Sequence, residues 1–75
     1  MTLGTWVGEP FVRRSNTMVE IEQNIDFGGS FVAWELWRVE MLGGEIQISS
    51  RSGGTIGIPP HVVPLVMEAM ASLNH

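Results

Sequence analysis

Few side chains in this sequence have the type and placement that catalysis needs. His61 stands at an expected helix start, and His75 is the last residue, where nothing holds the geometry of a general base. Asp26 lies beside glycines in a turn, where aspartate commonly makes local hydrogen bonds. Glu20 and Glu22 share one face of an expected strand, a pattern more typical of a solvated face than of a catalytic pair. We therefore expect a protein that is not an enzyme.

Metal and cofactor chemistry also lack support in the sequence. The chain has no cysteine, which excludes disulfides, thiolate zinc sites and thiol catalysis. We find no metal-ligand spacing, no nucleophile elbow and no phosphate loop. The Gly-Gly pairs at 28–29, 43–44 and 53–54 have the spacing of hairpin turns. We expect neither a metal nor a cofactor.

Tryptophan and arginine have the clearest binding chemistry. If the segment Phe31–Leu42 is a strand, Trp34 and Arg38 share one face and Trp37 lies on the other. One tryptophan is then expected in the core beneath a helix, and the second on the opposite face. An exposed tryptophan beside an arginine can stack on planar groups and bind anions, or it can make an oligomer contact. The alternative, in which both tryptophans belong to the core or to a dimer core, stays open. The candidate residues for binding nucleic acid or a partner are Arg13, Arg14, Phe31, Trp34, Arg38 and Arg51.

The charge balance is acidic. Eight acidic residues and four basic ones give a net charge of −4 and a pI near 4.9. Nucleic-acid binders usually carry a basic patch, because neutralised phosphates supply most of their non-specific affinity. All four basic residues are arginines, which favour planar, bidentate or stacked contacts.

The length of 75 residues fits one domain, which we assign to 1–75. A chain this short buries only about 60% of the surface that it exposes when unfolded, so we expect oligomerisation to add stability. No apolar run approaches the ~20 residues of a membrane helix, and no signal-peptide pattern is present. We expect a soluble, cytoplasmic protein with no membrane partner.

The predicted fold is α+β: an antiparallel β-meander of four to five strands followed by one C-terminal helix, dimerising. Residues 1–14 form an edge strand or arm, because Gly8 and Pro10 interrupt them. Residues 17–58 form the meander, with Val19 and Ile21 facing inward, a Gly43-Gly44 hairpin and a last short strand over 55–58. A helix over the tryptophan-rich segment is the alternative that stays open. Residues 60–74 form the C-terminal helix.

The expected C-terminal helix has an unusually wide apolar stripe. Its apolar residues recur at helical spacing, and Val63 widens the stripe. A stripe this wide exceeds what one sheet covers, which indicates a second partner, most simply another copy of the chain. The candidate oligomer-interface residues are Val62, Val66, Met67, Met70 and Leu73.

The segment Trp34–Leu73 resembles the single-stranded-DNA-binding domain of the transcriptional positive-cofactor family. The shared layout is a strand, a Gly-Gly hairpin, an Ile-Gln-Ile-Ser-Ser-Arg strand, the run Gly-Gly-Thr-Ile-Gly-Ile-Pro-Pro, and an apolar helix containing Leu65 and Met70. The resemblance covers about half of the chain and implies a curved four-stranded sheet that binds unpaired strands and pairs as a homodimer through its helices. It places Arg51 where the family tends to carry an arginine. The chain departs from the family in having no lysine and a short loop at 52–54.

Two hypotheses follow. The first is a non-catalytic homodimer that binds single-stranded nucleic acid on its sheet through tryptophan and arginine. The second is a small acidic inhibitor or anti-defence module, of the kind that phages encode, which occupies a host protein and can mimic a nucleic-acid strand. The acidic residues that would form its negative face are Glu20, Glu22, Glu35, Glu40 and Glu45.

Overall fold

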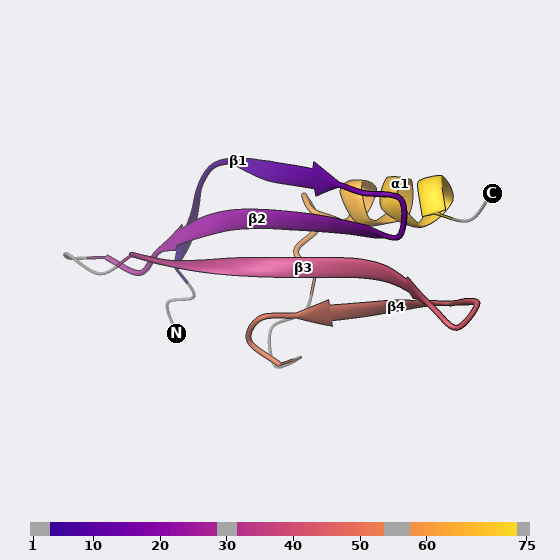
Figure 1. Ribbon diagram of the computed structural model, residues 1–75. Coiled ribbons are helices and arrows are strands. Elements are labelled where there is room, and N and C mark those ends of the chain that lie inside the picture. Colours follow the sequence, from indigo (N-terminus) through magenta and orange to yellow (C-terminus); the bar gives the residue numbers. More distant parts are fainter. Residues whose placement is uncertain (1–3, 29–31, 54–57, 74–75) are drawn as a thin grey trace.

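The computed structural model describes residues 4–28, 32–53 and 58–73 (Figure 1). Its elements are β1 (Thr5–Arg14), β2 (Met18–Asp26), β3 (Val32–Leu42), β4 (Glu45–Ser50) and α1 (Val63–Leu73). The strands form one antiparallel sheet in the order β1-β2-β3-β4. The predicted meander with a C-terminal helix is therefore confirmed, and the tryptophan-rich segment is a strand. Of the expected strand at 55–58, residues 55–57 lie outside the described residues, and Ile58 is not in a strand.

The helix begins later than the predicted residue 60. Pro59 starts a turn, in which its carbonyl oxygen accepts hydrogen bonds from the backbone N–H groups of Val62 (2.9 Å) and Val63 (3.2 Å). Pro64 is then the second residue of α1. Its missing N–H costs no helical hydrogen bond, because the first turn of a helix has no internal acceptor for that group.

Local sequence explains both the tight hairpin and the irregular edge strand. Leu42 pairs with Glu45, so Gly43 and Gly44 alone form the β3–β4 turn. Both have positive φ, 57° and 82°, as a type I′ turn requires.

In β1 the register shifts between Val7 and Phe11, at the bulge that contains Gly8 and Pro10. The bulge is at the sheet edge, where proline removes no ladder hydrogen bond.

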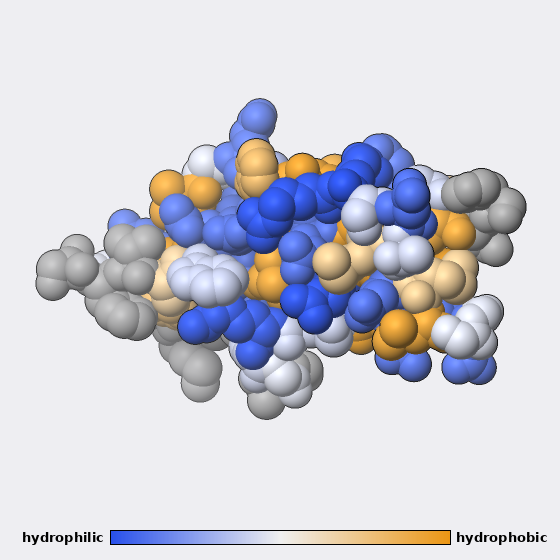
Figure 2. Space-filling view, in the orientation of Figure 1, coloured by the Kyte–Doolittle hydropathy of each residue, from blue (hydrophilic) through white to orange (hydrophobic). Residues whose placement is uncertain are grey.

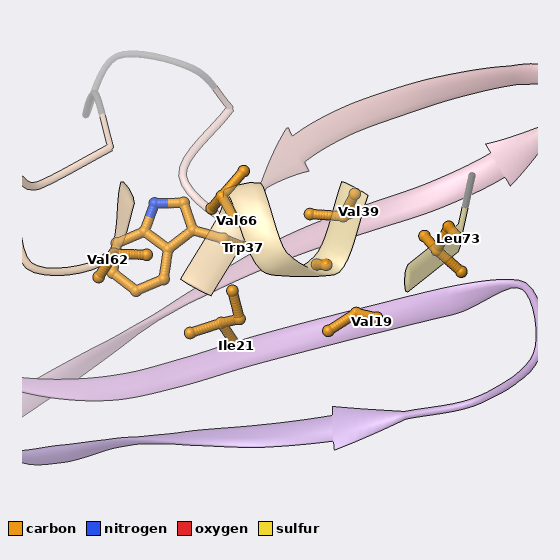
Figure 3. Close-up of a cluster of buried hydrophobic side chains, with 8 residues drawn as sticks. Val19, Ile21, Trp37, Val39, Val62, Val66 and Leu73 are labelled. Atoms are coloured by element: carbon orange, nitrogen blue, oxygen red, sulfur yellow. The ribbon is translucent and has the colours of Figure 1, made fainter. Parts of the chain in front are cut away.

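The core lies between one face of the sheet and α1. From the sheet it contains Val19, Ile21, Trp37 and Val39, and from the helix and the turn before it Val62, Val66, Ala69 and Leu73. Figure 3 shows these side chains pointing toward one another between β2, β3 and α1. The inward orientation predicted for Val19 and Ile21 is confirmed, because both are buried.

The opposite face of the sheet is not covered by α1, which packs only against the face that carries the core (Figure 1). We call this uncovered surface the open face. Hydrophilic side chains form a band across the molecule in the view of Figure 2, with apolar groups on both sides of it. No helix of the described residues is long and apolar enough to cross a membrane.

Candidate functional site

Trp34 lies on the open face with an arginine stacked on its ring. Trp34 is 41% exposed, whereas Trp37, three positions further along β3, is 1% exposed and lies in the core. The strand alternation predicted this division, with one tryptophan inside and one outside. The guanidinium carbon of Arg51 lies 4.3 Å from the centroid of the Trp34 ring, within the range of a cation–π contact.

Backbone hydrogen bonds hold Arg51 beside β3. Its N–H donates to the carbonyl oxygen of Leu36 at 2.9 Å, although Arg51 lies just beyond the end of β4. One carboxylate oxygen of Glu35 accepts from the N–H groups of Leu36 (2.9 Å) and Ser52 (3.3 Å). Glu35 is only 1% exposed and lies on the helix side of the sheet, so it cannot contribute to an acidic open face. It instead fixes the segment that carries Arg51.

A second aromatic–arginine pair also lies on the open face, but at the opposite edge of the sheet, on β1. Phe11 is 60% exposed, and the guanidinium carbon of Arg13 lies 5.5 Å from its ring centroid. The sequence pattern predicted a binding role for Arg13, whereas Phe11 was not among the predicted residues. The signal was available, because positions 11 and 13 share a face of any strand that contains both.

Two carboxylates neutralise two of the arginines on this face. Glu20 lies between Arg13 on β1 and Arg38 on β3 in the pairing register. A carboxylate oxygen of Glu20 accepts from Arg38 Nη2 at 3.0 Å and from its Nε at 3.2 Å. Arg13 Nη2 contacts Glu22 at 3.0 Å, and Arg13 Nε contacts Glu20 at 3.4 Å. The hydrogen bond to Glu22, with a smaller contribution from Glu20, raises the pKa of Arg13 above its usual value.

Arg14 does not belong to the same surface as Arg13. It pairs with Val19, a core residue of β2, and its Nη2 makes an ion pair of 2.9 Å with Glu68 of α1. Arg13 and Arg14 therefore do not share one surface of the sheet, because neighbouring strand residues point to opposite faces. Phe31, the other predicted aromatic, lies outside the described residues.

The predicted oligomer-interface residues divide into two groups. Val62, Val66 and Leu73 are buried in the chain's own core. Met70 is partly buried against that core, and Met67 is 60% exposed. The prediction that α1 contacts a second copy remains, but its surface centres on Met67.

His61 lies in a network of structural contacts. His61 Nε2 lies 2.6 Å from Gln23 Oε1, and Gln23 Nε2 donates to the carbonyl oxygen of Gly8 at 2.6 Å. Since the amide nitrogen faces Gly8, the amide oxygen accepts from His61. The His61 ring also packs against Trp6, with 5.4 Å between centroids, and Trp6 packs against Trp37 at 5.3 Å. This chain of contacts links the bulge of β1 to the residues before α1.

The described residues contain no group of three or more histidine, cysteine, aspartate or glutamate side chains that could hold a metal ion. Comparisons with protein-family models, with curated proteins and with solved structures found no match to this chain.

Proposed function

We propose that the open face binds single-stranded nucleic acid, with unpaired bases stacking on its aromatic rings and phosphates contacting its arginines. The observation that supports this most is the Trp34–Arg51 pair. It combines a tryptophan residue that is 41% exposed with a guanidinium carbon 4.3 Å from the centroid of its ring. Base–aromatic stacking contributes about 1–3 kcal/mol per base and tolerates any sequence. No described helix covers this face, so a strand can reach the ring.

The Phe11–Arg13 pair gives the proposed site a second stacking position. Phe11 is on β1 and Trp34 on β3, separated by two strand spacings, or about 10 Å. Through Glu22 of β2, Phe11 is aligned with Leu36, two residues from Trp34 along β3, which adds about 7 Å. One extended strand of a few nucleotides covers both rings.

A homodimer is part of the proposal. Exposed apolar side chains remain on the helix side of the molecule, with Val63 38% and Met67 60% exposed on α1 and Ile48 44% exposed on β4. A small domain gains stability when a second copy covers such surface. Light scattering tests this part, and a monomer at micromolar concentration would refute it without affecting the proposal for the open face.

The second candidate is a protein partner. The observation that favours it is the pairing of Arg13 and Arg38 with Glu20 and Glu22, because these arginines do not form an unpaired basic patch. Exposed tryptophan and arginine are also typical anchors of protein interfaces. An acidic inhibitor that docks on a host protein through Trp34 fits this arrangement.

Binding of labelled oligo(dT), measured by fluorescence anisotropy at low and moderate salt, separates the two candidates. We expect micromolar binding that weakens with salt. Trp34→Ala should weaken it by tenfold or more and Trp34→Phe by less, because phenylalanine retains a stacking ring. Arg51→Ala should weaken binding. Arg14→Ala is the matched control and should weaken it less, since Arg14 makes its ion pair with Glu68 of α1 on the helix side of the sheet. Absence of binding at low salt would leave the protein partner as the better candidate.

A further inference from the structure

Glu20 lies in the middle of the open face with an arginine on each side. One carboxylate oxygen contacts Arg13 Nε at 3.4 Å, and the other contacts Arg38 Nη2 at 3.0 Å. The Glu20 side chain is only 17% exposed, whereas the side chains of Arg13 and Arg38 are 47% and 43% exposed. The carboxylate is therefore shielded, while both arginine side chains remain accessible to a ligand.

We propose that Arg13 and Arg38 form a phosphate subsite and that Glu20 is the resident anion of this subsite. The inference rests on the proposed function. A carboxylate and a phosphodiester each present two oxygens that share one negative charge, bonded to carbon in the first and to phosphorus in the second. A guanidinium group binds either with the same N–H donors. A phosphate of a bound strand takes over the arginine donors that Glu20 occupies in the free protein. Glu20 thus sets how tightly, and with what salt dependence, the face binds a strand.

The two arginines depend on Glu20 to different degrees. Arg13 has a second carboxylate, Glu22, at 3.0 Å. Within the described part of the chain, Arg38 has an ion pair with Glu20 alone. Loss of the Glu20 charge therefore removes the ion pair of Arg38 and leaves Arg13 paired with Glu22. For a single strand, each additional phosphate contact makes the slope of log K against log salt more negative by about 0.7.

Glu20→Gln tests the inference, because glutamine keeps the shape and removes the charge. Glu40→Gln is the matched control. Glu40 is also on the open face, one row along from Glu20, and it makes no ion pair with any residue that the structure describes. Both variants change the net charge by the same amount, but only Glu20→Gln releases an arginine. The measurement is the anisotropy of labelled oligo(dT) with each variant over a series of salt concentrations.

We expect Glu20→Gln to bind about fivefold more tightly than wild type, the upper end of what an exposed ion pair contributes. Its salt slope should be more negative by about 0.7, and Glu40→Gln should show a smaller gain without that change in slope. Adding Arg38→Ala to Glu20→Gln should abolish the gain. If circular dichroism shows that Glu20→Gln is unfolded, Glu20→Thr, a residue that favours strands, replaces it.

The outcomes separate this inference from the proposed function. If wild type binds the strand and Glu20→Gln binds no better than Glu40→Gln, the resident-anion role is wrong and the nucleic-acid function stands. The same conclusion follows if the gain persists with Arg38→Ala. If wild type, Glu20→Gln and Glu40→Gln all fail to bind at low salt, both the function and the inference are overturned.

Discussion

The position of α1 can be tested with one substitution made twice on the same helix. Val66 is 4% exposed beneath the sheet, and Val63, one turn earlier, is 38% exposed. Val66→Ala and Val63→Ala remove the same two methyl groups and bring similar changes in helix propensity. Their difference therefore isolates burial against the sheet, the contact that leaves the other face of the sheet open.

The expected cost follows from the two exposures. Removing two buried methyl groups at Val66 costs about 1.6 kcal/mol in transfer free energy, and a residual cavity adds up to about 1 kcal/mol. The better helix propensity of alanine returns about 0.5 kcal/mol. Val66→Ala should thus lower the free energy of unfolding by about 2 kcal/mol, whereas Val63→Ala, at a site that is 38% exposed, should lower it by only about 0.5 kcal/mol. For a domain of this size a loss of 2 kcal/mol lowers the Tm by roughly 8–16 °C.

Urea denaturation followed by circular dichroism measures both variants, and the measurement is repeated at two protein concentrations. Equal losses would refute the arrangement of α1 on the sheet, and with it the identity of the open face. A loss for Val63→Ala that shrinks as the protein is diluted would instead show that a second copy covers this side of the helix, because a contact between copies adds stability only at concentrations where the copies associate.

Two further predictions concern the turn and the buried amide. Gly44→Ala should lower the free energy of unfolding by about 1–2 kcal/mol, because φ is 82° there. Gly43→Asn should be nearly neutral at φ 57°, since asparagine tolerates this region; similar losses in urea would exclude the type I′ turn. Gln23→Leu should cost about 1–3 kcal/mol, because it removes the donor to Gly8 and the acceptor for His61. It should cost more than His61→Ala in the same assay, and the reverse order would contradict the bridging role of Gln23.

Residue alternation predicted much of the sheet from the sequence. Val19 and Ile21 are buried as their spacing indicates, and Trp34 and Trp37 lie on opposite faces because they are an odd number of positions apart. The Gly43-Gly44 dipeptide predicted the tight turn for the same kind of local reason, since both residues need positive φ. These features depend on neighbours in sequence, so one sequence was enough.

The ion pairs of the open face could not be predicted in the same way. They depend on the register in which Arg13 pairs with Glu20, and that register depends on the length of the turn between β1 and β2. A one-residue slip would have turned Arg14 toward the carboxylates and Arg13 toward the helix. The alternation in β1 shows that the two arginines point apart, but it does not show which one meets Glu20. Only the three-dimensional pairing decides that.

The charge pairing on the open face determines how a partner would be recognised. With a net charge of −4 and with Arg13 and Arg38 already paired, the chain has little long-range attraction for a polyanion. Under the proposed function, selection would then depend on direct contact: a ligand would have to offer an anion to the arginines and a planar group to Trp34 or Phe11 at a set spacing. A nucleic-acid strand meets both requirements with every nucleotide, because base and phosphate repeat together. A protein meets them only where an acidic and a planar side chain are held at that spacing, so a protein partner would have to be specific, whereas any unpaired strand would suffice.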